Sequence, residues 1–344
     1  MKVYLVDPCL IQPKLAAFQR DSYQEILACA HLDQRQHHSL VSQPDEADLI
    51  IAPIQFGGYG PFLETLKKSH FYQTYRDKMF VYCMDDEQYP SLPGVYPAIR
   101  AEWVRQGWAL GGHYLSHTLS KFDFACLPPS QRDILFSFAG SSRTHPIREK
   151  VLQLNHPRSF LFDSSPKTEQ TPWYNKDQNT VQKLRQQFQD VITRSQFVLC
   201  PRGIAPSSIR VFEAMQAGCV PVIIADELVL PQGPNWQIFS VVIAEKEIAT
   251  IPKLLEQLEP RFADMSLASR KAWEGFFSPQ ASFETLVDWC AQLKQGLSTK
   301  NRNFEAARVQ VGEVLRVQNV RVHLRHFRLR YLSNTPLRHP ASQP

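Results

Sequence analysis

Short runs rich in β-branched and aromatic residues alternate along the first part of the chain with longer segments that mix apolar and polar residues. The short runs predict β-strands over residues 2–6, 49–53 and 79–84. The longer segments predict α-helices over residues 19–31 and 60–76. Because strands that alternate with helices favour parallel pairing through crossover connections, this part is expected to form an α/β layer.

A second set of alternating runs begins after Leu127-Pro128-Pro129, where the paired prolines disfavour a helix and act as a stiff hinge. Strands are expected over residues 134–139, 159–162, 197–200, 220–224 and 240–243, and helices over residues 146–154, 178–193, 209–217 and 248–258. The pattern predicts two Rossmann-like α/β domains, residues 1–128 and 129–282, that face each other across a cleft. Residues 283–298 are expected to form a helix that packs back on the first domain, and residues 299–344 a basic extension.

Composition agrees with two globular domains and argues against a nucleic-acid-binding body. The chain has 344 residues, of which 43% are hydrophobic and 21% charged, as in ordinary soluble proteins. Its net charge is +5, but residues 300–344, with one Lys and eight Arg against two Glu, carry +7 by themselves. The rest of the chain is slightly acidic, so no nucleic acid is expected as a partner.

Cysteine usage and the N-terminal run predict a cytoplasmic protein. The seven cysteines are widely spaced and form no CxxC, which argues against a zinc site and a disulfide framework. Several lie inside apolar runs, where a free thiol acts as a small buried hydrophobe. The N-terminal run ends at Asp7 and Pro8, unlike a secretory signal, and no stretch reaches the roughly 18 apolar residues of a membrane span.

The most informative segment of the chain for function is residues 197–225, FVLCPRGIAPSSIRVFEAMQAGCVPVIIA. A strand is followed by a turn at Pro201-Arg202-Gly203, and Ser207 or Ser208 is expected to cap the helix that comes next. A helix start with free backbone N–H groups and nearby hydroxyls favours an anion. The segment therefore predicts a phosphate site between a strand and a helix.

Three charged side chains surround that point. Arg202 and Arg210 could bind a diphosphate in bidentate fashion, and Glu213 could accept hydrogen bonds from a ribose diol. Arg210 and Glu213 are three residues apart and so share one helical face. The alternative is that they form a surface ion pair, but the preceding turn with Arg202 favours ligand binding.

The segment SFAGSSRTHPIR, residues 137–148, has a similar arrangement. A predicted strand is followed by a turn with serines and an arginine, and then by a predicted helix. Gly140 permits a close approach of the backbone, and Ser141 and Arg143 could reach the phosphates. The alternative is an ordinary turn between a strand and a well-capped helix.

Four stretches of the chain resemble the exostosin domain of inverting glycosyltransferases, family 47. They are LCPRG–SSxR–FEAM–AGCVPVIIAD–LP (residues 199–231), SFAGSSRTHPIR (residues 137–148), ADLIIAP (residues 47–53) and the run from Trp236 through FSVVI to Glu245. They occur in family order over a core of residues 44–245. The resemblance implies an α/β fold of GT-B type, a nucleotide-sugar donor in the C-terminal domain and an acceptor between the domains. It also implies that no metal cofactor is needed, and the chain has no isolated Asp-x-Asp.

Inverting transfer needs a general base on the acceptor side. Asp85 and Asp86 follow a predicted strand and are the expected catalytic candidates, since neighbouring carboxylates raise each other's pKa. The alternative is that Asp86 caps the next turn and Asp85 forms a local salt bridge. His113 and His117 are further candidates for a base or for metal ligands, and the Gly-x-Asp-His turn of plant members is not clearly present.

The expected function is glycosyl transfer with inversion, from a nucleotide-sugar, first of all a UDP-sugar, to a hydroxyl of a glycan or lipid-linked acceptor in bacterial surface polysaccharide synthesis. The alternative is a non-catalytic nucleotide-sugar-binding or glycan-binding protein with the same fold. The tail, in which basic and apolar residues alternate over residues 320–332, could lie on the inner face of an anionic membrane. It could equally pair with the protein body or with a polyanionic glycan.

Overall fold

The computed structural model describes residues 1–12, 21–54, 59–86, 89–104, 107–115, 124–165 and 178–297, together with Phe304 and Arg308. One compact unit comprises Met1–Leu297, and a second comprises Ser298–Pro344. The predicted amphipathic tail over residues 320–332 lies outside the described residues.

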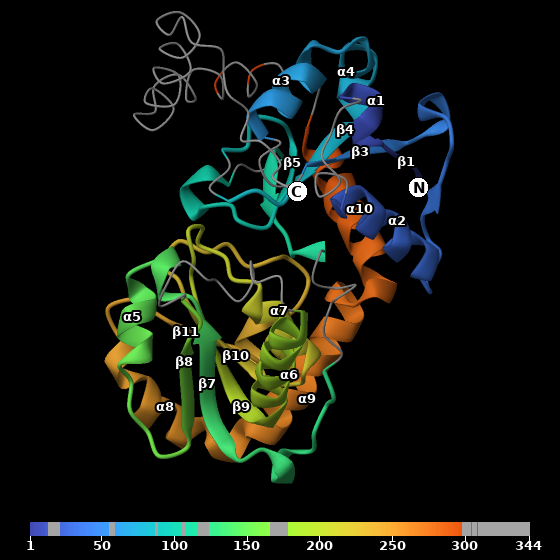
Figure 1. Cartoon of the computed structure of the whole chain (residues 1–344). Helices are drawn as coiled ribbons and strands as arrows, with labels where there is room; N and C mark the ends of the chain where they lie inside the picture. The colour runs from blue at the N-terminus through green and yellow to red at the C-terminus, as the bar shows by residue number, and fades with distance from the viewer. Residues whose placement is uncertain are drawn as a thin grey trace, which may run out of the picture. The chain divides into compact units, whose positions relative to one another are not determined.

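The first unit contains a parallel sheet of six described strands in the order β2-β1-β3-β4-β5-β6 (Figure 1). The strands are β1 (Lys2–Leu5), β2 (Ser39–Leu40), β3 (Leu49–Ile54), β4 (Met79–Cys83), β5 (Gly94–Tyr96) and β6 (Ala109–Gly111). β3 and β4 are buried along their whole length, which explains their continuous apolar sequences. The strands predicted over residues 2–6, 49–53 and 79–84 are therefore confirmed, whereas the short strands β2, β5 and β6 were not predicted.

The helices of this half are α1 (Pro8–Ile11), α2 (Asp21–Leu32), α3 (Tyr59–Lys68) and α4 (His70–Tyr75). The single helix predicted over residues 60–76 is wrong, because the chain breaks at Ser69. The Ser69 hydroxyl accepts a hydrogen bond from the Tyr72 amide at 3.0 Å and starts a new helix.

A second parallel sheet has the order β11-β10-β9-β7-β8. Its strands are β7 (Ile134–Gly140), β8 (Ser159–Asp163), β9 (Ser195–Pro201), β10 (Val220–Ile224) and β11 (Val241–Ile243), and its helices are α5 (Ile147–Leu152), α6 (Gln178–Arg194), α7 (Arg210–Gln216), α8 (Ile251–Leu258) and α9 (Phe262–Ala272). α5 and α8 cover one face, while α6 and α7 cover the other (Figure 1). These are two Rossmann-like α/β domains, so the expected α/β fold of GT-B type is confirmed.

Successive residues of the central strands point to opposite faces of the sheet and so belong to two different hydrophobic cores. Leu199 and Val222 point into the core beneath α5 and α8. Val198, Cys200 and Ile223 point to α6 and α7, and this second core continues into the first sheet.

Two segments after α9 connect the sheets. A π-helix, η11 (Trp273–Phe277), precedes α10 (Pro279–Gly296), and α10 packs against α2 and against β3, β5 and β6. At the junction the Phe277 ring lies 5.1 Å from Phe212 of α7 and 5.2 Å from His113 of the first half. The two sheets therefore share a continuous apolar core.

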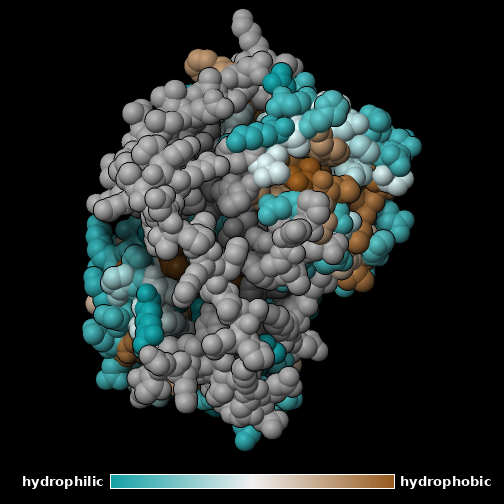
Figure 2. Space-filling model, turned by 45° about the horizontal axis from the view of Figure 1, so that its top comes forward, coloured by the Kyte–Doolittle hydropathy of each residue, from teal (hydrophilic) through white to brown (hydrophobic). Residues whose placement is uncertain are grey.

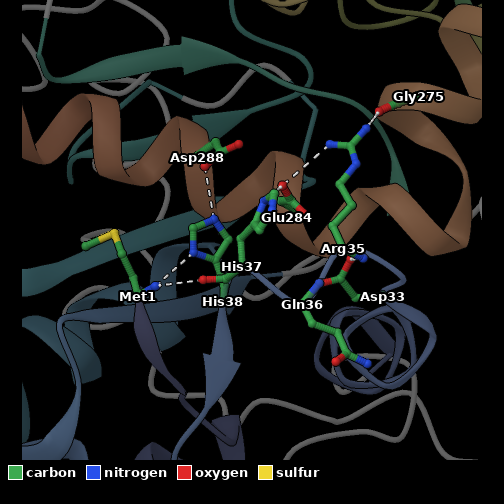
Figure 3. A network of polar contacts seen from close by, with 9 residues as sticks. All are labelled: Met1, Asp33, Arg35, Gln36, His37, His38, Gly275, Glu284 and Asp288. Atoms are coloured by element: carbon green, nitrogen blue, oxygen red, sulfur yellow. Dashed lines mark hydrogen bonds and ion pairs between the residues drawn. The ribbon is translucent and has the colours of Figure 1, made fainter.

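Polar contacts also attach α10 and η11 to the segment before β2 (Figure 3). His37 Nδ1 lies 2.8 Å from Glu284, and His38 Nε2 lies 3.0 Å from Asp288. Arg35 donates to the Gly275 carbonyl at 2.7 Å. These contacts join residues more than 200 positions apart in the sequence.

The strands of both sheets end at the same place. Arg100, which follows β5, binds Glu227, which follows β10, at 2.6 Å. The Ala101 amide donates to the Glu227 carbonyl at 3.0 Å. A Cβ added to Gly111, the last residue of β6, would lie 2.7 Å from the Val229 carbonyl oxygen. The carboxyl ends of the two sheets thus face each other, and ligands of α/β sheets bind at such ends.

On the face drawn in Figure 2 the described surface is mostly hydrophilic, and the largest group of hydrophobic residues lies at the upper right. Several large apolar side chains, among them Leu10, Ile204 and Val242, are exposed. None of the described helices combines the length and the apolar character that crossing a membrane requires.

Replacement of Phe277 by Ala is expected to destabilise the protein by about 3–5 kcal/mol, because the ring is fully buried between the two sheets. Urea unfolding followed by circular dichroism measures the change. Leu267→Ala on α9 is the control, since Leu267 is 57% exposed and should cost little. Equal effects of the two substitutions would contradict a shared core.

Candidate functional site

The loop after β7 is built around Gly140 and a cluster of hydroxyl groups. A Cβ at Gly140 would lie 2.8 Å from Nη2 of Arg210, so glycine leaves room for that guanidinium. The Ser141 hydroxyl lies 2.9 Å from that of Ser165 and accepts from the Arg143 amide at 3.3 Å. Ser141 therefore stabilises the loop, and Arg143 is exposed on it.

The same loop is anchored by Asp163 at the end of β8. Ser142 donates to its carboxylate from the backbone at 3.0 Å and from the hydroxyl at 2.8 Å. Burial raises the pKa of Asp163, but hydrogen bonds from Ser165 and Ser142 outweigh it and bring the pKa to about 2. Asp163 is therefore ionised at neutral pH and holds the turn in place.

Arg210 and Glu213 come from α7 and lie beside this loop. The Arg210 guanidinium carbon is 5.2 Å from the ring centroid of Phe138 and 5.6 Å from that of Phe188. Its Nε has no hydrogen-bond partner among the described residues. Burial lowers the pKa of Arg210, although the charge of Glu213 opposes the shift. The group combines a positive charge with unused hydrogen-bonding capacity.

Glu213 is buried, so the alternative of a surface ion pair with Arg210 is wrong. Burial raises the pKa of Glu213 to about 7, and the opposing charge of Arg210 does not cancel this effect. The carboxyl is therefore partly protonated near neutral pH. A raised carboxyl pKa beside an arginine, at the carboxyl end of a sheet, is typical of a functional site.

Neither Ser207 nor Ser208 caps α7, and that prediction is wrong. The helix begins at Arg210, its N-cap residue is Ile209, and no side chain caps it. The Ser208 carbonyl instead accepts from the Val211 amide at 3.1 Å. The Ser207 side chain is hydrogen-bonded to Tyr114 of the first half, so it joins the sheets rather than capping the helix.

Arg202 has carboxylate partners within the protein. Its Nη1 lies 3.4 Å from Glu227 and 3.7 Å from Glu245, and its Nη2 donates to the Ile204 carbonyl at 3.4 Å. Glu227 also binds Arg100. Arg202 thus lies at the end of β9 as expected, with its charge compensated by acidic residues.

The two acidic candidates of the first half differ in their surroundings. Asp85 is buried next to Cys83. Asp86 is half-buried and lies near enough to Tyr114 and to Arg148 to raise the pKa of both, although burial is the main influence on each. The structure therefore brings Asp86, from the first half, toward a cation of the second.

His113 is a core residue and not a base. Its Nε2 lies 3.0 Å from the Ser282 hydroxyl, and its ring packs against Phe212, Phe277 and Trp289. Burial lowers its pKa to about 3, so the ring is neutral. His117 lies outside the described residues. Within the described ranges, no group of three His, Cys, Asp or Glu residues could hold a metal ion.

Sequence comparison assigns the second half of this arrangement to a family. Residues 125–258 match the Exostosin GT47 domain. The chain carries an exostosin-like GT47 domain. It extends from the segment before β7 to the end of α8 and contains Gly140, Arg202, Arg210 and Glu213. Asp86 and Tyr114 lie outside it.

Relatives among plant and animal proteins are similar to this chain over part of their length. A probable glucuronosyltransferase of Oryza sativa subsp. japonica is 26% identical over 178 residues, which cover 46% of this chain and 39% of the relative. A probable glucuronoxylan glucuronosyltransferase of Arabidopsis thaliana is 42% identical over 73 residues, covering 21% and 16%. An exostosin-1 homolog of Caenorhabditis elegans is 37% identical over 73 residues, covering 21% and 19%. The chain thus spans less than half the length of these relatives.

Solved structures give a more distant similarity. Anabaena HepE in complex with UDP and glucose is 10% identical with a TM-score of 0.41, over 84% of this chain and 99% of that one.

Sequence reasoning missed two residues that the structure places beside the GT47 domain's strand ends. Arg148 is the last residue of the SFAGSSRTHPIR segment, and Tyr114 follows His113. Both are buried and polar or charged, which sequence periodicity does not reveal. The arginine in a family-like segment was the one available signal.

Glu213→Gln is expected to change how stability depends on pH. Since the folded state keeps the Glu213 proton up to about pH 7 and the unfolded state loses it near pH 4.5, wild-type stability falls between these values. Between pH 4.5 and pH 8 the free energy of unfolding of the wild-type protein should therefore fall by about 3 kcal/mol more than that of Glu213→Gln. Below pH 4.5 this pH-dependent difference should vanish. Urea unfolding at several pH values measures it, and a difference that stays constant with pH would refute the assignment.

Proposed function

We propose that the chain is an inverting glycosyltransferase that moves a sugar from a nucleotide-sugar, most simply a UDP-sugar, to a hydroxyl of a glycan or lipid-linked acceptor. The observation that carries the proposal lies where the carboxyl ends of both sheets face each other. There Tyr114 of the first half is hydrogen-bonded to Ser207 of the second, and Asp86 and Arg148 lie near them. The GT47 domain, and relatives whose names include glucuronosyltransferase and xylosyltransferase, support it.

The donor would bind at the ends of β7 and β9. Arg210, beside Gly140, has a free Nε–H for the diphosphate, and charge-assisted hydrogen bonds to phosphate are strong. Glu213, on the same helix, would accept from the ribose hydroxyls, whose hydrogen bonds favour its ionised form. Arg202 would join them when the diphosphate replaces Glu227 and Glu245 as its partner.

Asp86 would be the general base. It would take the proton from the acceptor hydroxyl while that oxygen bonds to the anomeric carbon and the bond from carbon to the diphosphate oxygen breaks. The arginines would stabilise the charge that develops on the departing diphosphate, the role a metal ion plays in other enzymes. Transfer is therefore expected to need no metal and to survive EDTA.

We further propose that the acceptor belongs to a bacterial surface polysaccharide and that the enzyme acts in the cytoplasm. The basic residues after Lys300 would let it lie on the inner face of an anionic membrane. Co-sedimentation with anionic vesicles, lost on removal of residues 300–344, tests this part independently.

UDP is expected to stabilise the wild-type protein by about 2.7 kcal/mol at 100 times its Kd. Arg210→Ala should weaken UDP binding about tenfold or more, because one charged hydrogen-bond donor is lost. Isothermal titration calorimetry measures the Kd. Arg194→Ala is the control, since Arg194 pairs with Asp133 at the amino ends of the strands. Equal affinities in both variants would count against the donor site.

Asp86→Asn is expected to lower the rate of UDP release from a panel of UDP-sugars about 100-fold or more while UDP affinity stays within about twofold. Asp85→Asn, compared under the same conditions, should lower the rate less. Should wild-type protein bind UDP but release none from any UDP-sugar, with or without glycan acceptors, the chain is a binding protein and not an enzyme.

A further inference from the structure

Arg148, on α5, connects the two loops of the proposed donor site. Its Nε donates to the Arg202 carbonyl at 2.8 Å, its Nη2 to the Pro201 carbonyl at 3.4 Å, and its Nη1 to the Ser141 carbonyl at 3.1 Å. Ser141 follows β7, and Pro201 ends β9. One buried guanidinium therefore connects the loops that follow two neighbouring strands of the sheet.

The position of this guanidinium is fixed on two further sides. Its carbon lies 5.8 Å from the ring centroid of Phe138. A Cβ at Gly203 would lie 3.3 Å from its Nη2, which is closer than a side chain normally tolerates. Glycine at position 203 thus allows the guanidinium to reach both loops.

Arg148 stays charged although it is buried. Its hydrogen bonds within the described ranges go to carbonyl groups, and none goes to a carboxylate. Burial and then the repulsion of Arg210 lower its pKa to about 10, so it stays charged at neutral pH, and Asp86 acts in the opposite direction. The guanidinium is therefore a charged donor to the carbonyls of both loops, and charge-assisted hydrogen bonds are stronger than neutral ones.

We propose that Arg148 is a positioning residue that fixes the two donor-binding loops as one surface. The inference rests on the proposed function, because it takes these loops as the donor site. The arrangement makes the two loops a single unit.

Two substitutions separate the roles of Arg148. Arg148→Lys keeps the charge but cannot bridge three carbonyls, and Arg148→Met removes both. Arg132→Lys and Arg132→Met are the matched controls: Arg132 is equally buried and bonds four carbonyls, of Leu127, Thr193, Ser195 and Ala217, at the amino ends of the strands. Gly203→Ala displaces the guanidinium without removing it and serves where an Arg148 variant does not fold.

In UDP titrations and UDP-release assays, Arg148→Lys should raise the UDP Kd about tenfold and leave the pH profile unchanged. Arg148→Met, which removes every hydrogen bond from this side chain to the loops, should raise the UDP Kd further. The Arg132 variants should lose thermal stability but alter neither quantity. A UDP Kd that changes no more in Arg148→Met than in Arg132→Met would overturn the proposal.

Hydrogen–deuterium exchange needs no ligand and tests the loops directly. In Arg148→Lys and Gly203→Ala, peptides over residues 141–145 and 201–206 should both exchange faster, while the Arg132 variants leave them unchanged. If wild-type protein neither binds UDP nor releases it, the proposed function fails, and joint loosening of the loops still supports Arg148 as their connector. Exchange that is unchanged, or changed in one loop alone, would overturn the proposal.

Discussion

The packing of α7 against the junction of the two sheets determines where the site lies. Phe212 is buried against Phe277 and against His113, so the helix is held from the second sheet, from η11 and from the first half at once. Arg210 and Glu213 flank Phe212 in the sequence. Because the aromatic ring fixes the helix, it also fixes the two charged side chains at the end of β7.

A second constraint is electrostatic. Three arginines, Arg148, Arg202 and Arg210, lie near the carboxyl ends of β7 and β9, and burying cations together is unfavourable without acidic partners. Each has a different one: Glu213 beside Arg210, Glu227 and Glu245 beside Arg202, and Asp86 near Arg148. An incoming diphosphate would bring two or more negative charges to these arginines. It would therefore compete with the carboxylates that now compensate their charge.

Much of the fold follows from local sequence. The apolar runs at β3, β4, β9 and β10 predict buried parallel strands, and the turn with Arg202 and the spacing of Arg210 and Glu213 predict where charge gathers. Long-range contacts could not be predicted. The partner of Ser207 is Tyr114, far away in sequence, and the partners of Arg202 come from positions 227 and 245. The Ser69 cap that splits one helix in two competes locally with an otherwise helical pattern, so periodicity misses it.

The central claim is that the facing carboxyl ends of the two sheets form a nucleotide-sugar donor site on α7 and the loops after β7 and β9. A crystal structure of the protein with UDP tests it most directly. The account predicts diphosphate oxygens within about 3 Å of the Arg210 guanidinium and ribose hydroxyls within about 3 Å of the Glu213 carboxylate. UDP bound elsewhere on the molecule, with Arg210 and Glu213 untouched, would contradict it.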